Sequence, residues 1–309
     1  MYDIIGDIHG HASKLKELLQ KLGYEQTETG YAHPERTVIF VGDFIDRGVD
    51  LEEHRTLLFD IVMPMVNNGH AKSVMGNHEF NCLAYHTEDP NNPGHHLRLH
   101  TDKNTKQHEA FLNEFEHEPE TIEQIKQFFY TLPMWLEIDG IRVIHACWHK
   151  SYIEELKQRT NERGLIDEGF LIEASNKETD AYNQVETILK GVEMKLPEGI
   201  SFRDKDNHPR QEARIMWWKP NALPLGDVAM QITREELGEA TSLPQTHDFP
   251  DYSESEPLTF VGHYWNEGTP KPLTRNVTCL DYSVAKDGHL CAYRYSGETE
   301  LKQENYVWV

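Results

Sequence analysis

Cysteine is scarce in this sequence, and no two cysteines are closely spaced. The four cysteines are Cys82, Cys147, Cys279 and Cys291, and none of them forms a Cys-x-x-Cys pair. This spacing argues against a zinc ribbon. Four cysteines in 309 residues also do not make a disulfide scaffold. We therefore expect a protein with reduced thiols.

Long hydrophobic runs are absent as well. No stretch approaches the run of about 18 apolar residues that a transmembrane helix needs. Met1 leads directly into a short apolar stretch, so we expect no signal peptide. Together with the reduced cysteines, these features predict a cytoplasmic protein that does not enter membranes.

Positive charge is the third shortage. The chain has 30 Lys and Arg against 52 Asp and Glu, which gives a formal net charge of −22. Such a surface repels nucleic acids and anionic membranes over long range, so stable nucleic-acid binding is not expected. A local positive centre could still capture a phosphate. Acidic surfaces also serve solubility alone, so the charge by itself does not indicate a function.

Three glycine-containing motifs follow three short apolar stretches near the start of the chain. They are Gly6-Asp7-Ile8-His9-Gly10, Gly42-Asp43-Phe44-Ile45-Asp46-Arg47-Gly48 and Gly76-Asn77-His78-Glu79. Apolar residues at helical spacing between them predict one helix that follows a possible N-cap at Ser13 and stops at Gly23, and a second over about 51–66. Strands that alternate with helices predict a largely parallel sheet. In such sheets ligands bind at the carboxyl ends of the strands, where all three motifs lie.

The later part of the chain continues the core in separate pieces. Apolar strands are expected at 141–144, which leads into His145, and at 258–261, which leads into Gly262-His263. The segment 276–309 alternates well enough for two or three antiparallel strands. The polar stretches between these pieces, about 85–130 and 150–255, are interpreted as insertions over the rim of the site. We expect one domain over residues 1–309.

Six side chains follow these strands and have the chemistry of metal ligands. They are Asp7, His9, Asp43, Asn77, His145 and His263. Carboxylate, amide and imidazole groups suit divalent first-row metals. A pair of metal ions with a bridging carboxylate needs about this set, and it turns a bound water into a nucleophile. His11 is the main alternative at the first position, and His149 is the main alternative at the second.

Three further residues fit a reaction at phosphorus. His78 follows Asn77 directly and is expected to protonate the leaving oxygen without binding metal. Asp46 would orient the imidazole of His78. Arg47 carries a planar fork of donors that matches a phosphate group.

The ordered set of motifs closely resembles the calcineurin-like metallophosphoesterase superfamily, and in particular the PPP-type phosphatases. That group includes serine/threonine protein phosphatases and bacterial diadenosine tetraphosphatases. The resemblance implies an α/β (α+β) fold, a β-sandwich of two mixed sheets flanked by helices with the site at the strand ends. It assigns Asp7, His9 and Asp43 to one metal ion, and Asp43, Asn77, His145 and His263 to the other. It also pairs His78 with Asp46 and places Arg47 on the phosphate.

The sequence departs from that pattern in two places. Cys147 stands where the family usually has glycine, and it is interpreted as a small buried filler, with a redox-sensitive thiol as the alternative. The family has a second phosphate-binding arginine, for which Arg214 is the candidate and Arg203 and Arg210 are rivals. Trp217 and Trp218 are expected to pack in the core, although they could stack on a substrate ring.

The predicted function is a dinuclear metal-dependent phosphoesterase in which a metal-bridging hydroxide attacks phosphorus directly. Phosphomonoesters or phosphoproteins are the first choice of substrate, because of Asp46 and Glu79 in the second and third motifs. Hydrolysis of dinucleoside polyphosphates is the alternative. A non-catalytic metal-binding scaffold is disfavoured, since every catalytic position is filled. Manganese is the preferred metal, while iron and zinc suit the same ligands. Neither the physiological substrate nor the oligomeric state can be predicted.

Overall fold

The computed structural model describes residues 1–48, 50, 52–161, 163–203, 209–220, 222–243, 249–250 and 252–309. Leu51, the first residue of the second predicted helix, lies outside these ranges. Parts of the predicted insertion over 150–255 also lie outside them.

The first of two mixed sheets has six strands in the order β14-β15-β1-β4-β5, with β16 paired to β15. Strands β1, β4 and β5 run parallel to one another, whereas β15 is antiparallel to β1. The strands are β1 (Tyr2–Ile5), β4 (Thr37–Phe40), β5 (Ala71–Ser73), β14 (Asp281–Tyr282), β15 (His289–Tyr295) and β16 (Tyr306–Trp308).

The second sheet has four strands in the order β13-β12-β7-β6. They are β6 (Trp135–Ile138), β7 (Ile141–Ile144), β12 (Leu258–Val261) and β13 (Val277–Cys279). Strands β7, β12 and β13 are parallel, so the expectation of only antiparallel strands after residue 276 is wrong for β13. Strand β13 pairs with β12, the preceding strand of the chain, and the connection between them lets both run in the same direction.

The two sheets pack face to face over an apolar layer. Ile4 and Ile39 of the first sheet and Phe260 of the second belong to this layer. The alternate residues Ile5 and Phe40 point to the opposite face of the first sheet and join the helix-side core. Successive side chains of a strand point to opposite faces of the sheet, so a strand that is covered on both faces needs apolar residues at consecutive positions. The predicted α/β class with a β-sandwich of two mixed sheets is confirmed.

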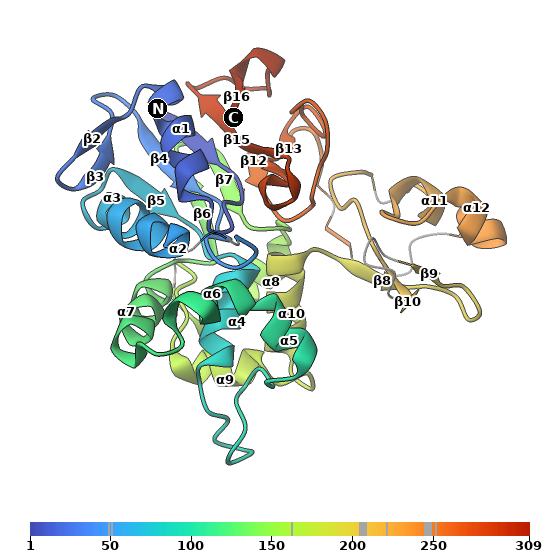
Figure 1. Cartoon of the computed structure of the whole chain (residues 1–309). Coiled ribbons are helices and arrows are strands. Elements are labelled where there is room, and N and C mark those ends of the chain that lie inside the picture. The colour runs from blue at the N-terminus through green and yellow to red at the C-terminus, as the bar shows by residue number, and fades with distance from the viewer. Residues whose placement is uncertain are drawn as a thin grey trace.

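Helices cover the outer face of the first sheet (Figure 1). They are α1 (Ala12–Leu22), α2 (Glu53–Arg55) and α3 (Met63–Asn67), with a π-helical stretch at Thr56–Val62 before α3. Helix α1 ends as predicted at Gly23, whose φ of 89° suits glycine. Pro64 lies in the first turn of α3, where its missing N–H is tolerated. The hairpin β2 (Glu25–Thr27) and β3 (Gly30–Ala32) follows α1.

The stretch from 85 to 130 is more regular than its polar sequence indicates. It follows α4 (Asn77–Tyr85) and contains α5 (Asp102–Gln107), α6 (Glu109–Phe115) and α7 (Pro119–Tyr130). Phe111 and Phe115 are fully buried and anchor α6 against the core. Two aromatic side chains therefore suffice to dock α6, whereas α5 has no buried residue.

The stretch from 150 to 255 begins with three helices and continues as short hairpins. The helices are α8 (Lys150–Arg159), α9 (Glu168–Ala174) and α10 (Asp180–Lys190). Figure 1 shows the later elements as a lobe extending to the right of the main body. That lobe contains β8 (Glu193–Lys195), β9 (Phe202–Arg203), β10 (Pro209–Arg210), β11 (Glu212–Arg214), α11 (Leu225–Val228) and α12 (Arg234–Leu237). A single domain over 1–309 stays a prediction.

A buried ion cluster holds the start of the first sheet together. Asp3 in β1 is fully buried and accepts hydrogen bonds from Arg36 (2.8 Å), Arg294 (3.2 Å) and the Tyr24 hydroxyl (3.0 Å). Two guanidinium groups therefore share one carboxylate as their counter-ion. Removing one member of such a cluster leaves buried charge uncompensated.

We predict that Asp3→Asn lowers the free energy of unfolding by about 3 kcal/mol, because both arginines lose their counter-charge. Urea unfolding followed by circular dichroism measures this loss. Glu17→Gln is the control, since Glu17 pairs with Lys14 on the surface, where ion pairs contribute little. Equal losses in the two variants would contradict the structural role given to Asp3.

Candidate metal centre and active site

The candidate site lies where the carboxyl ends of strands from both sheets meet. Asp7 and His9 follow β1, Asp43 follows β4, and Asn77 begins α4 just after β5. From the second sheet, His145 and His263 follow β7 and β12. Because the strands within each group are parallel neighbours, their ends converge as the alternation of strands and helices predicts.

Two glycines make room for the carboxylates. A Cβ atom on Gly262 would lie 1.9 Å from Oδ1 of Asp7, and one on Gly76 would lie 2.3 Å from Oδ1 of Asp43. No side chain fits at either position. Asp43 itself has a φ of 53° and His263 a φ of 70°, in the left-handed region that non-glycine residues avoid. Such backbone costs about 1–3 kcal/mol per residue and concentrates at functional sites.

Asp43 is the centre of the cluster. Its Oδ2 atom lies 3.3 Å from Nε2 of His145, 3.7 Å from Nε2 of His9 and 3.8 Å from Nε2 of His78. Nε2 of His145 is also 3.1 Å from Oδ1 of Asn77. One carboxylate oxygen thus faces three imidazoles that come from three different loops.

The hydrogen bonds of these rings fix where their lone pairs point. Nδ1 of His145 lies 2.7 Å from one backbone carbonyl, and Nδ1 of His9 lies 3.0 Å from another. Each Nδ1 must therefore carry the proton, which leaves a bare Nε2 lone pair directed at Asp43 when the ring is neutral. Nε2 of His9, Nε2 of His263 and Oδ1 of Asp7 are buried without a hydrogen-bond partner. Lone pairs that face a carboxylate in this way call for a cation between them.

The pKa values of the same groups point to missing positive charge. Burial, the nearby Asp281 and Asp43 raise the pKa of Asp7 well above its usual range, against the opposing effect of His145. Burial lowers the pKa of His9 to about 3. Burial also acts to lower the pKa of His145, but Asp43 outweighs it and raises that pKa to about 10. Divalent ions between these groups would supply this positive charge, so the residues fit a metal centre.

Two buried acids hold the loops in place. Glu79 accepts hydrogen bonds from the backbone N–H groups of Asp43 (2.8 Å), Phe44 (2.8 Å) and Gly76 (2.9 Å). Asp281 accepts from the N–H groups of Trp265 (2.8 Å) and Ser283 (2.9 Å), and so fixes the loop after His263. Asp281 was missed in the sequence, because an isolated aspartate beside a short strand carries no motif.

The predicted pair of His78 and Asp46 lies in contact. Nδ1 of His78 is 2.6 Å from Oδ2 of Asp46. Burial acts to lower the pKa of His78, but the carboxylates of Asp43 and Asp46 outweigh it and raise that pKa above its ordinary value. The other oxygen of Asp46 lies 2.8 Å from Nδ1 of His108, a residue that the sequence motifs do not include.

The alternatives left open by the sequence lie elsewhere. His11 precedes α1, and its Nδ1 contacts the carbonyl of Ile8. His149 caps the N-terminus of α8 and stacks on Tyr152 at 3.8 Å. Neither belongs to the histidine and aspartate groups that surround Asp43. Cys147 is fully buried, and burial raises the pKa of its thiol, which fits the interpretation as a packing residue.

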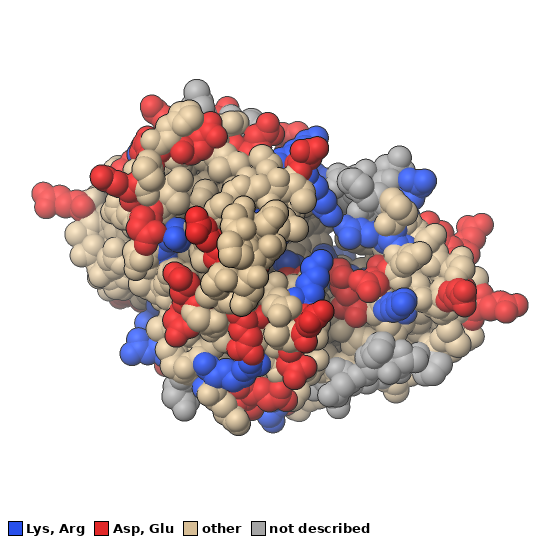
Figure 2. All heavy atoms as spheres, turned by 90° about the horizontal axis from the view of Figure 1, so that it is seen from below, with Lys and Arg blue, Asp and Glu red and all other residues tan. Residues whose placement is uncertain are grey.

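A cavity of about 810 Å³ opens beside the cluster, and its wall includes Asn77, His78 and His263. Figure 2 shows the surface hollowed between the main body and the lobe, with Lys and Arg side chains near the opening. Among the residues that the structure describes, the wall contains eight basic side chains against four acidic ones, although the whole chain is strongly acidic. The basic residues are Arg47, Arg98, Lys103, Lys177, Lys190, Arg210, Arg214 and Lys286.

Two of the predicted phosphate ligands lie in this wall. Arg47 stacks over Trp265, with its guanidinium carbon 4.2 Å from the ring centre. Arg214 also lines the cavity and has a buried Nε without a hydrogen-bond partner. Arg210 lines it as well, whereas Arg203 does not. Trp217 is almost fully buried, and its Nε1 donates hydrogen bonds to the carbonyl of Ala146 and the hydroxyl of Tyr264.

Two sequence relatives are similar to this chain over part of their length. The bis(5'-nucleosyl)-tetraphosphatase PrpE of Halalkalibacterium halodurans is 45% identical over 78 residues, 25% of this chain and 30% of that protein. The enzyme of the same name from Oceanobacillus iheyensis is 29% identical over 162 residues, 52% of this chain and 60% of that protein. The chain thus spans less than two thirds of the length of these relatives.

Solved structures show a similar fold. A cold-active protein-tyrosine phosphatase from a Shewanella species has a TM-score of 0.52 at 17% identity, over 95% of this chain and 75% of that one. A protein serine/threonine phosphatase from Saccharomyces cerevisiae has a TM-score of 0.51 at 14% identity, over 100% of this chain and 78% of that one. At these identities the likeness concerns the fold alone.

The calcineurin-like phosphoesterase family model matches residues 2–191, which is more than half of the chain. This match confirms the predicted family. The region includes the three glycine motifs and His145, although it ends before His263. The chain belongs to the calcineurin-like phosphoesterase family.

Proposed function

We propose that this protein is a phosphoesterase that works with two divalent metal ions. The main support is the position of Asp43, whose Oδ2 faces three imidazole nitrogens within 3.8 Å. Asp7 and His9 would share one ion with Asp43. Asn77, His145 and His263 would hold the other. Bound there, the ions would supply a nucleophilic hydroxide and polarise the phosphoryl oxygens. Manganese is our first choice of metal, and iron or zinc suits the same donors.

The remaining residues bind the substrate and move a proton. Arg47 points its guanidinium fork at phosphate oxygens while Trp265 supports it from one side. His78 donates a proton from Nε2 to the leaving oxygen, since its Nδ1 is held by Asp46. Arg214, which lines the same cavity, provides a second donor for the phosphate.

The charge of the cavity favours a small substrate with several phosphates. A single phosphate needs one or two cationic partners, whereas eight basic side chains surround a space of about 810 Å³. The relatives named bis(5'-nucleosyl)-tetraphosphatases agree with this choice over their matched parts. We therefore place a dinucleoside polyphosphate ahead of the phosphomonoester or phosphoprotein that the sequence favours. In the sequence, Glu79 and Asp46 are the reason for placing phosphomonoesters and phosphoproteins first. In the structure Glu79 binds the backbone of the Asp43 loop and Asp46 binds His78, so their positions do not favour those substrates.

Other aspects of the proposal follow from simpler features. A non-catalytic scaffold is disfavoured because the proposed acid, ligands and phosphate-binding arginine all lie around one cavity. Among the described residues, no helix is long and apolar enough to cross a membrane. All four cysteines are free and buried, which supports a reducing compartment such as the cytoplasm.

We predict different losses for Asp43→Asn and His78→Asn. Asp43→Asn removes the shared carboxylate, so bound metal and activity should both fall, with activity at least about 1000-fold lower. His78→Asn should keep the metal and lower kcat by about 100- to 10,000-fold. Elemental analysis and p-nitrophenyl phosphate hydrolysis with manganese measure the two effects. His117→Asn, on an exposed histidine, is the control. Normal phosphate release from both site variants would refute the assignment.

We also predict a preference for diadenosine tetraphosphate over a phosphoserine peptide. The double variant Lys103→Ala/Lys177→Ala removes two exposed lysines of the cavity wall. It should raise KM for the dinucleotide about tenfold, equivalent to about 1.4 kcal/mol, and leave p-nitrophenyl phosphate nearly unaffected. Lys72→Ala/Lys302→Ala, also exposed but outside the wall, is the matched control. Faster hydrolysis of the peptide, or equal effects of both double variants, would contradict the polyphosphate proposal.

A further inference from the structure

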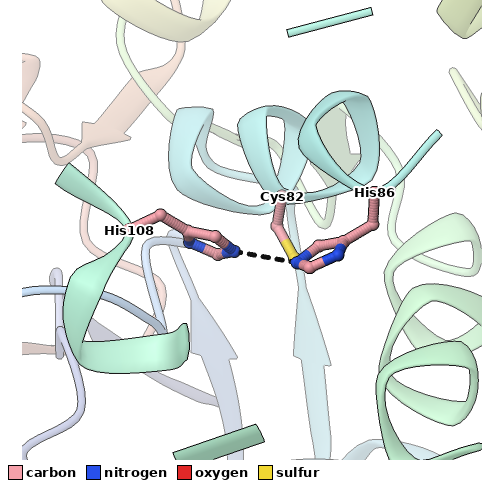
Figure 3. A group of neighbouring side chains, drawn as sticks. All are labelled: Cys82, His86 and His108. Carbon is pink, nitrogen blue, oxygen red and sulfur yellow. Dashed lines mark hydrogen bonds between the residues drawn. The ribbon is translucent and has the colours of Figure 1, made fainter. Parts of the chain in front are cut away.

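A second group of possible metal ligands lies on the far side of Asp46 from His78. Figure 3 shows Cys82 and His86 on α4 and its C-terminal end, with His108 approaching from the junction of α5 and α6. Cys82 and His86 are four residues apart, so both side chains lie on one face of the helix. One donor atom from each of the three residues lies within 4.8 Å of the others.

The hydrogen bonds of His108 leave its Nε2 lone pair available for a cation. Its Nδ1 lies 2.8 Å from Oδ1 of Asp46, so Nδ1 carries a proton that it donates to the carboxylate. Nε2 of His108 then faces Nε2 of His86 at 3.1 Å. A carboxylate that binds the rear nitrogen of a histidine is the usual support of a metal-ligating imidazole.

The spacing and the surroundings suit a tetrahedral ion. Two imidazole nitrogens on one zinc ion are about 3.3 Å apart, close to the observed 3.1 Å. Stacking on Phe111, with ring centres 4.6 Å apart, holds the ring of His108 in place. Burial and the nearby carboxylates of Asp46 and Glu79 raise the pKa of the Cys82 thiol, while Lys126 opposes them. A cation bound at the sulfur would offset the two carboxylates.

We propose that Cys82, His86 and His108 bind a zinc-like divalent cation, separate from the pair around Asp43. Binding replaces the thiol proton of Cys82, which passes to solvent, by a sulfur–metal bond. Three protein ligands leave a fourth position for water. His86 is partly exposed, so an ion can reach the site from solvent along this side chain. By fixing His108, the cation would also fix Asp46 and the orientation of His78.

The competing arrangement needs no cation. His86 can donate its Nε2 proton to Nε2 of His108, which would form a hydrogen-bonded chain from His86 through His108 and Asp46 to His78. The two arrangements differ in the state of Cys82, which is a thiolate ligand in the first and a neutral thiol in the second. A probe of sulfur–metal bonding therefore separates them.

Cobalt(II) titration of the metal-depleted full-length protein provides that probe. None of the ligands proposed around Asp43 is a cysteine, so a thiolate-to-cobalt charge-transfer band reports the new site alone. We expect this band in the wild-type protein together with a third equivalent of bound cobalt. Cys82→Ser should abolish the band and the third equivalent, while Cys291→Ser, on a cysteine buried in β15, should retain both.

His86→Asn tests the site without replacing a fully buried residue, and it should weaken cobalt binding at least about tenfold at the third equivalent only. It decides the result if circular dichroism shows that Cys82→Ser is unfolded. Absence of the band in the wild type, an unchanged band in Cys82→Ser, or an unchanged cobalt affinity of the third equivalent in His86→Asn would overturn the proposal. Two bound equivalents without a thiolate band would leave the proposed function intact and reject this inference alone.

Discussion

The structure depends on how buried negative charge is balanced around Asp43. Four acids, Asp7, Asp43, Glu79 and Asp281, are almost completely buried close to one another. Backbone N–H groups satisfy Glu79 and Asp281. Within the described part of the chain, Asp7 and Asp43 each accept only one backbone N–H, so Oδ1 of Asp7 has no partner and Oδ2 of Asp43 faces imidazoles. Burying carboxylates in this way is unfavourable unless cations accompany them. The glycines, the left-handed backbone of Asp43 and the orphaned ring nitrogens all follow from that requirement.

The two sheets and the peripheral segments contribute different residues to the site. The β-sandwich brings strand ends from both sheets to one point, which concentrates the proposed metal ligands. The helices and hairpins from the later segments contribute most of the basic residues in the cavity wall, such as Lys103 and Lys177. A chain with a formal charge of −22 thereby presents a locally basic cavity. We infer that the sheets determine the chemistry and the peripheral segments determine the substrate.

The sequence predicts the centre of the site much better than its edges. Asp7, Asp43 and Asn77 follow apolar strands inside glycine motifs, so local spacing alone indicates that they converge. His108 and Asp281 carry no such signal, because each comes near the site only through packing of distant elements. The helices α5 and α6 are short and mostly polar, and only α6 has buried aromatic side chains that hold it against the core. The cavity wall combines residues from Arg47 to Lys286, and that combination exists only in the folded chain.

Anomalous X-ray scattering from crystals soaked in manganese tests most directly whether metal ions balance the negative charge around Asp43. The account predicts two manganese peaks about 3.5–4 Å apart, one on each side of the Asp43 carboxylate. Asp7 and His9 should coordinate the first peak, and His145 and His263 the second. A single peak, or side chains of His145 and His263 turned away from the ions, would contradict it.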